Sequence, residues 1–157
     1  LAALLLNVLT LAPGEAAFLR AGQLHAYLSG LGVEVMANSD NVLRGGLTTK
    51  HVDVPELVKV LDFGTLENPR AEATPSHGGV EFQLPVDSFV VRVHSLADGE
   101  TLAIDEDGPA IVLCTSGEVR GPDGFVLSQG NAAWAPASER EVQLTAEGAA
   151  QVFVATA

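Results

Sequence analysis

Cysteine is nearly absent from the sequence, since Cys114 is the single one in 157 residues. One cysteine cannot form an internal disulfide, which excludes a disulfide-stapled secreted scaffold and suits a reducing cytoplasm. The surrounding residues AIVLCTS form an apolar run of strand length, so we expect the Cys114 thiol to be buried in a strand. The expected localisation is cytoplasmic.

Positive charge is also scarce. Eight Lys and Arg residues stand against twenty Asp and Glu residues, which gives a net charge of −12. Residues 1–50 carry three charges of each sign, so the whole negative excess lies in residues 51–157. An acidic surface without a basic run repels nucleic acid and anionic lipid. We therefore expect neither nucleic acid nor a membrane as a partner.

Long apolar runs and aromatic side chains are missing as well. The opening LAALLLNVLTLAPGEAA lacks a basic start, and Asn7 and Thr10 interrupt an apolar stretch far shorter than a bilayer span, which favours a core strand over a signal peptide or membrane helix. Aromatic residues make up only 5%, beside 16 Gly and 8 Pro, a composition that favours many short strands joined by turns. The length fits one domain, or one domain and a fragment of another.

The first part of the chain predicts short strands and one helix. Runs bounded by turn residues predict strands at 3–11, 16–20, 24–28 and 33–37. The period then changes to a helical one in DVPELVKVLDF, residues 53–63.

The start of this helix has its own signals. Asp53 lies three residues before Glu56, as in a capping box, and Pro55 falls in the first turn. Val54, Leu57, Val58 and Leu61 would share one helical face. We expect one short helix in residues 53–63.

The second part of the chain predicts an antiparallel β-domain. Residues 64–79, rich in polar residues, Pro and Gly, indicate a linker or long exposed connection. After it come strand-length runs at hairpin spacing: VEFQLP, SFVVRVHSL, TLAI, AIVLCTS, GFVLSQG, AAWAPA, EVQLTA and AQVFVAT. Such spacing is typical of a β-sandwich or jelly roll, so we predict an all-β fold with one short helix.

A cluster of polar residues interrupts the expected strands of the first part. His25 and Tyr27 alternate in AGQLHAYL and would project to one face, and Glu34 shares a face with Met36 in the next strand. A His and a Tyr on an inner face need a ligand, a metal or a polar network. The alternatives are a hydrogen-bonded core histidine at position 25 and an exposed strand carboxylate at position 34.

A second group of residues follows in NSDNVLRGGLTTK. Arg44 precedes Gly45 and Gly46, where the backbone could approach a ligand closely. A guanidinium there could hold a phosphate through paired hydrogen bonds, and Lys50 would add a point charge. The alternative is a surface arginine in a hairpin.

The other histidines offer less. His51 adjoins Lys50, His77 lies in the expected linker, and His94 alternates with Arg92 on what we interpret as a solvated strand face. The sequence holds no Ser-His-Asp order, CxxC, P-loop or GxGxxG motif.

Residues 4–63 resemble a known family over nearly their whole length. The stretch LLLNVLTLAPGEAAFLRAGQLHAYLSGLGVEVMANSDNVLRGGLTTKHVDVPELVKVLDF, with its HAYL, SDNV and RGGLT motifs and following Lys, resembles the type I mannose-6-phosphate isomerases (phosphomannose isomerases). The remainder resembles the C-terminal cupin of that family more loosely. This resemblance to the C-terminal portion of the family outweighs the structural alternatives given above for the individual residues.

The resemblance implies cupin-like jelly-roll barrels, a bound zinc ion (Zn2+) and the interconversion of mannose 6-phosphate and fructose 6-phosphate. By position in the motifs, His25 would be the last zinc ligand, and Tyr27 and Glu34 would line the sugar pocket. Arg44 would be the active-site arginine, and Lys50 would complete a basic wall. Such chemistry passes through an enediol(ate), whose negative charge needs a nearby cation or metal.

The chain departs from the family in one respect. The other zinc ligands of the family, a Q-x-H pair and a later Glu, lie upstream of the residues present here, as does a helical domain. We therefore expect this chain to hold about one ligand of four, to need the missing N-terminal part of the same enzyme, and to be inactive in isolation.

The expected domains are residues 1–63, part of the catalytic cupin barrel; a linker at 64–79; and residues 80–157, a cupin-like domain without metal ligands. Two other functions remain open. The chain could be a non-catalytic cupin that binds sugar phosphate through Arg44 and Lys50 or stabilises a larger assembly. Residues 80–157 could also serve only as a cap.

Overall fold

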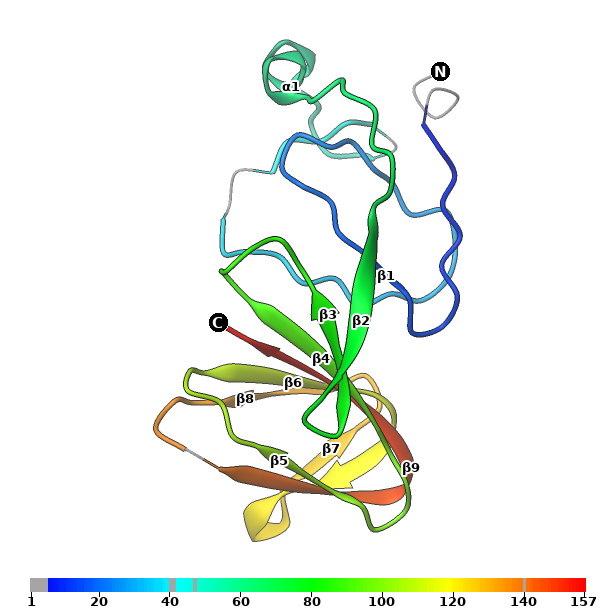
Figure 1. Ribbon diagram of the computed structural model, residues 1–157. Coiled ribbons are helices and arrows are strands. Elements are labelled where there is room, and N and C mark those ends of the chain that lie inside the picture. The colour runs from blue at the N-terminus through cyan, green and yellow to red at the C-terminus, as the bar shows by residue number, and fades with distance from the viewer. Residues whose placement is uncertain (1–5, 40–41, 47, 140) are drawn as a thin grey trace. The chain divides into compact units, whose positions relative to one another are not determined.

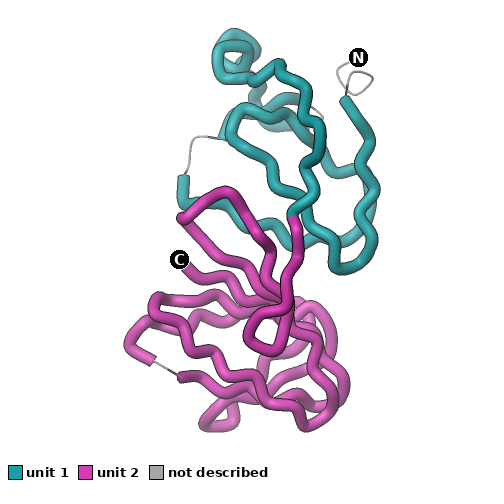
Figure 2. Tube along the Cα trace, viewed as in Figure 1, with its two compact units in different colours: residues 1–71 teal, residues 72–157 magenta. Residues whose placement is uncertain are grey.

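The computed structural model describes residues 6–39, 42–46, 48–139 and 141–157. The chain divides into two compact units, which we call unit 1 (residues 1–71) and unit 2 (residues 72–157) (Figure 2). The described residues fall into nine strands and one α-helix (Figure 1), so the predicted all-β class with one short helix is confirmed. Within this described part, no helix has the length and apolar character needed to cross a membrane.

Unit 1 contains little regular structure. Its elements are strand β1 (Ala16–Ala17), helix α1 (Val54–Val60) and the first residues of strand β2 (Arg70–Ser76). β1 pairs antiparallel with the start of β2, with Ala16 opposite Ala71. The rest of its described residues form turns and irregular chain.

Helix α1 confirms the prediction from its capping signals. The Asp53 side chain accepts a hydrogen bond from the Glu56 backbone N–H at 3.0 Å, which satisfies one of the free donors of the first turn. The Glu56 carboxylate instead accepts from Lys59 Nζ at 2.7 Å, so only half of the predicted capping box forms. The helix ends at Val60 because Leu61 is extended, with ψ 132°.

Several strands predicted in unit 1 are wrong. Residues 24–28 and 33–37 are not strands, and the strand predicted at 16–20 is reduced to Ala16–Ala17. Of the strand predicted at 3–11, residues 6–11 are irregular and residues 3–5 lie outside the described residues. Side-chain alternation predicts which way residues face, but a strand also needs a partner for its backbone hydrogen bonds, and these segments have none among the described residues.

Unit 2 is a curled antiparallel sheet. It contains most of β2, and then β3 (Gly79–Gln83), β4 (Val90–Leu96), β5 (Thr101–Ile104), β6 (Ala110–Arg120), β7 (Val126–Ser128), β8 (Ala132–Ala135) and β9 (Val142–Thr156). The strand order is β2-β3-β4-β9-β6-β7, with β5 also paired to β9 and β8 also paired to β6. A short 3-10 turn at Pro122–Gly124 precedes β7.

Strand β9 gives the sheet its curl. The sequence predicts two strands here, EVQLTA and AQVFVAT, but they form one strand of 15 residues. Its first residues pair with β5, its last residues pair with β4, and β6 pairs along both parts. Because one strand serves two sets of neighbours, it must bend between them, as in a cupin-like half-barrel (Figure 1).

The bend coincides with an irregularity in the pairing of β6 and β9. The register shifts on both sides of Ser116, which is the pattern of a β-bulge. Gly117 beside it has φ +72°, and a Cβ there would lie 2.3 Å from the Ala149 carbonyl oxygen. Glycine is therefore required at position 117 for this close approach.

The hydrophobic core lies in unit 2. Its members come from strands β4 to β9, and they include the Cys114 thiol, which is fully buried as predicted. Burial raises the pKa of Cys114, so the thiol is inert. The core cluster consists of Leu96, Leu102, Ile104, Ala110, Val112, Cys114, Val119, Leu127, Ala135, Leu144, Ala146, Ala150, Val152 and Val154.

The boundary between the units falls at residue 71. Strand β2 therefore occupies part of the 64–79 segment that we expected to be a linker. The domain bounds 1–63 and 80–157 stay predictions.

Candidate functional site

Tyr27 and Glu34 meet in unit 1. The Tyr27 hydroxyl donates a hydrogen bond to Glu34 Oε1 at 2.7 Å, across a turn that contains Gly30 at φ +108°. Glu34 and Met36 are exposed, whereas Val33 and Val35 are half-buried. The alternation of side chains that the sequence predicts is thus kept without the strand, and it turns Glu34 outward to meet Tyr27.

The hydrogen bond to Glu34 affects the ionisation of Tyr27. Desolvation and then the neighbouring Glu34, through its hydrogen bond and its charge, raise the pKa of Tyr27 to about 12. Tyr27 therefore stays a protonated phenol near neutral pH and acts as a hydrogen-bond donor. The Glu34 carboxylate is the acceptor of the pair.

His25 lies beside this pair. Its ring packs edge-on to the Tyr27 ring, with 6.0 Å between the ring centroids. His25 Nδ1 is 3.0 Å from the Gln23 carbonyl oxygen. Because a carbonyl only accepts, Nδ1 carries the proton in this contact, and Nε2 is left with its lone pair.

This tautomer suits a metal ligand. Ligating histidines commonly donate their second ring N–H to a carbonyl or carboxylate, as His25 does to Gln23. However, among the described residues no group of three or more His, Cys, Asp and Glu could hold a metal ion. The described residues therefore offer one candidate metal ligand in this segment, His25.

Arg44 and Lys50 follow in an exposed segment. A Cβ at Gly45 would lie 2.1 Å from Leu24 Cδ1, so the backbone after Arg44 lies directly against the residue that precedes His25. Glycine at position 45 permits this approach. The structure thus brings the backbone segments of Arg44 and His25 together, and among the described residues no hydrogen bond joins the two side chains.

Lys50 is held locally through its backbone, whose N–H donates to Thr48 Oγ1 at 3.1 Å. Its side chain is exposed. Asp40, Asn41 and Leu47, which belong to the SDNV and RGGLT motifs, lie outside the described residues.

Unit 2 corrects the interpretation of Arg92 and His94. We predicted a solvated strand face, but His94 is only 3% exposed and Arg92 is half-buried. They lie opposite Val152 and Val154 of the core, and directly opposed residues project from the same face of a sheet. Leu96, two residues after His94, is also buried, and this apolar residue on the same face is the sequence signal for the burial of His94.

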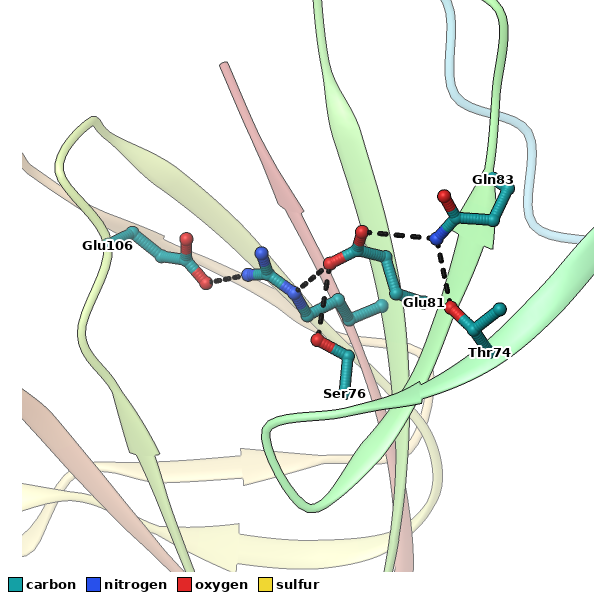
Figure 3. A network of polar contacts seen from close by, with 6 residues as sticks. Thr74, Ser76, Glu81, Gln83 and Glu106 are labelled. Atoms are coloured by element: carbon teal, nitrogen blue, oxygen red, sulfur yellow. Dashed lines mark hydrogen bonds and ion pairs between the residues drawn. The ribbon is translucent and has the colours of Figure 1, made fainter.

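Arg92 is the centre of a polar network in unit 2 (Figure 3). Its Nε donates to Glu81 at 2.8 Å, and its Nη1 pairs with Glu106. Glu81 also accepts from Gln83 and from Ser76. The hydrogen bond from Arg92 is the main cause that lowers the pKa of Glu81. Through Arg92 and Glu81 the network connects β2, β3, β4 and the segment after β5.

Comparisons with known proteins complete the description. No family model matches the chain. It is 43% identical to mannose-6-phosphate isomerase of Escherichia coli over 92% of its length, and 44% identical to that of Salmonella typhimurium over the same share. The chain spans 38% of the length of each of these relatives. This partial coverage fits the C-terminal portion that the motifs indicate.

A solved structure agrees with these sequence relatives. The apo form of mannose 6-phosphate isomerase from Salmonella typhimurium superposes with a TM-score of 0.60 at 35% identity, over 77% of this chain and 32% of that one. The cupin-like all-β fold predicted from the sequence is therefore confirmed.

Proposed function

Because this chain belongs to the mannose-6-phosphate isomerase family, we propose that it is part of an enzyme that interconverts mannose 6-phosphate and fructose 6-phosphate. The observation that carries the proposal is the Tyr27–Glu34 hydrogen bond with His25 packed against it. These three residues lie in the segment that holds the family motifs. The relatives match 92% of this chain, and their names give mannose 6-phosphate as the substrate.

Within this proposal, His25 supplies one zinc ligand through Nε2. The other ligands would come from the missing N-terminal part of the same enzyme, which the 38% coverage of the relatives supports. A bound zinc ion would stabilise the negative charge that develops on a substrate oxygen. We expect the isolated 157-residue chain to bind zinc weakly and to isomerise poorly or not at all.

The remaining residues of the site bind and orient the substrate. Arg44 and Lys50 would hold anionic oxygens, because the net charge of −12 opposes the approach of a sugar phosphate and only local cations can offset it. Tyr27, whose one hydroxyl proton is donated to Glu34, would orient that carboxylate and accept a hydrogen bond from a sugar hydroxyl. Glu34 is left as the group of the pair that can accept a proton from a sugar hydroxyl or carbon.

The compartment that we propose is the cytoplasm. The one cysteine is buried and unpaired, which is the usual state in a reducing environment.

Arg44→Ala in a complete enzyme that carries this sequence tests the proposal. Loss of a cation that faces developing negative charge lowers turnover by about 100- to 1,000-fold, and sugar-phosphate affinity should fall with it. Formation of fructose 6-phosphate in a coupled assay gives both quantities. Lys59→Ala is the matched control, because Lys59 is an exposed cation of the same unit that pairs only with Glu56 in the described structure. Unchanged kinetics in Arg44→Ala would refute the assignment.

A non-catalytic sugar-phosphate module is the second candidate. It is favoured by the lack of a metal-holding group among the described residues. The two functions differ in their response to a chelator. Removal of metal should abolish turnover of the complete isomerase and zinc should restore it, whereas a binding module would keep its affinity for mannose 6-phosphate.

A further inference from the structure

Unit 2 contains an open cavity of about 320 Å³. It lies between the β2–β3 turn, which supplies His77 and Gly78, and strands β4 and β5 with the segment between them. All its lining residues belong to unit 2, so the cavity is separate from His25, Tyr27 and Glu34 of unit 1. Its volume is at the lower end of the range for small-molecule sites, the size for a single sugar ring.

A buried imidazole lines this cavity. His94 is 3% exposed, and its Nδ1 has no hydrogen-bond partner among the residues that the structure describes. A Cβ at position 79 would lie 2.5 Å from this Nδ1, so the Gly79 backbone lies directly over this nitrogen and glycine is required there. Nδ1 is therefore sealed, and the His94 ring can meet a ligand in the cavity only through its other nitrogen, Nε2.

The charge state of His94 favours an uncharged partner. Desolvation, followed by the positive charge of Arg92, lowers the pKa of His94. The ring is therefore neutral near pH 7 and carries one donor and one acceptor nitrogen. A hydroxyl group, which both donates and accepts, can bond to Nε2 in either tautomer of the ring.

The other residues that line the cavity narrow the class of ligand. Glu100 and Asp105 place carboxylates at the exposed edge, and Leu96 and Leu102 form a buried apolar floor. Carboxylates accept hydrogen bonds from hydroxyls but repel a phosphate. A metal ion is not supported, because no group of three or more ligands exists among the described residues.

We propose that this cavity binds a small uncharged polyhydroxyl molecule, such as a free monosaccharide. The hydroxyls bond to the His94 ring and the two carboxylates, and the C–H face of the sugar ring packs on Leu96 and Leu102. This site is distinct from the sugar-phosphate site of unit 1 and has the opposite preference for charge.

The four histidines of the chain allow a direct test by imidazole NMR of the 157-residue chain. His25 and His51 report on unit 1, and His77 and His94 report on the cavity. Titration with mannose should shift the signals of His94 and His77 saturably, with a dissociation constant in the millimolar range. Mannose 6-phosphate should shift them less at equal concentration. The absence of a saturable shift, or an equal response to both sugars, would overturn the proposal.

A cavity-filling substitution sharpens the test without touching the buried ring. Ala103→Phe changes an exposed residue at the cavity and should abolish the response of His94 to mannose. Ala132→Phe changes an exposed strand alanine of unit 2 outside the cavity and should leave the response unchanged. An Ala103→Phe chain that still responds like the unmodified one would contradict the site. Signals of His25 and His51 report on the unit 1 site independently.

Discussion

The two units of the molecule differ: unit 2 contains the hydrophobic core, and unit 1 contains the candidate sugar-phosphate site. Every hydrophobic residue that is buried among the described ones belongs to unit 2. Most large exposed hydrophobic residues belong to unit 1, among them Leu31 at 91% and Phe63 at 77% exposure. The candidate sugar-phosphate site lies in unit 1, where turns and hydrogen bonds hold the side chains and the described residues include no buried hydrophobic one. Unit 2 contains the buried core.

This difference supports the proposal that unit 1 is completed by another part of the enzyme. Large exposed apolar side chains gathered in one unit favour a surface that contacts another protein segment. A site on such a surface becomes rigid only when its supporting residues are covered.

The largest expected effect contrasts one leucine from each unit. Leu144→Ala removes a side chain that is 2% exposed in the core of unit 2 and should lower the free energy of unfolding by about 2–5 kcal/mol. Leu31→Ala should change it by no more than about 0.5 kcal/mol. Urea unfolding followed by circular dichroism measures both. Equal losses would show that unit 1 has a core of its own.

The next effect concerns the charges inside unit 2. Arg92→Leu leaves Glu81 and Glu106 half-buried without their cation and should cost about 1–3 kcal/mol. The pKa of Glu81 is lowered in the folded state. The ionised carboxylate therefore contributes to stability in full above its unfolded pKa of about 4.3, and this stability is lost as the pH falls through the folded pKa.

Acid unfolding of the two chains measures this contribution. The unmodified chain should lose more stability than Arg92→Leu when the pH falls below about 4.3. Arg120→Leu is the control, because Arg120 is exposed and pairs with Glu118 and Glu147 at the surface, where ion pairs contribute little. Parallel acid curves for the unmodified and Arg92→Leu chains would rule out the linkage.

The smallest effect on stability, and the most specific to unit 1, concerns Tyr27. It is the single tyrosine of the chain, so tyrosinate absorbance reports on it alone. Its pKa should be about 12, and the signal should be nearly absent at pH 10, where a free tyrosine is about half ionised. Glu34→Gln should lower this pKa in part, because burial, the largest cause of the rise, remains, and Glu67→Gln should leave it unchanged. An ordinary pKa in the unmodified chain would show that Tyr27 and Glu34 do not meet in solution.

Much of unit 2 and the helix of unit 1 could be predicted from the sequence. TLAI is strand β5 residue for residue, and Asp53 with Pro55 marked the start of α1. These features depend on neighbours in the chain, through turn chemistry, capping and alternation. The union of two predicted strands into β9 could not be foreseen, because it depends on pairing with β4, β5 and β6 at once.

The candidate site residues also separate into those that local sequence identified and contacts that depend on the fold. The motifs singled out His25, Tyr27, Glu34, Arg44 and Lys50, and the roles of these residues stay predictions. Sequence spacing did not show that Tyr27 donates to Glu34 across Gly30. His94 was set aside as solvated, since its burial comes from strands that lie far away in the sequence.

By itself the sequence determined the all-β class, the short helix, the acidic surface of the second half and the family motifs, because each is written in local residue order and composition. Only the tertiary structure decided that the buried core of the described residues lies in unit 2, that Arg92 and His94 face its interior, and that a cavity opens beside His94. Burial and side-chain contact arise from strand pairing between distant residues, and local pattern does not specify which strands will meet.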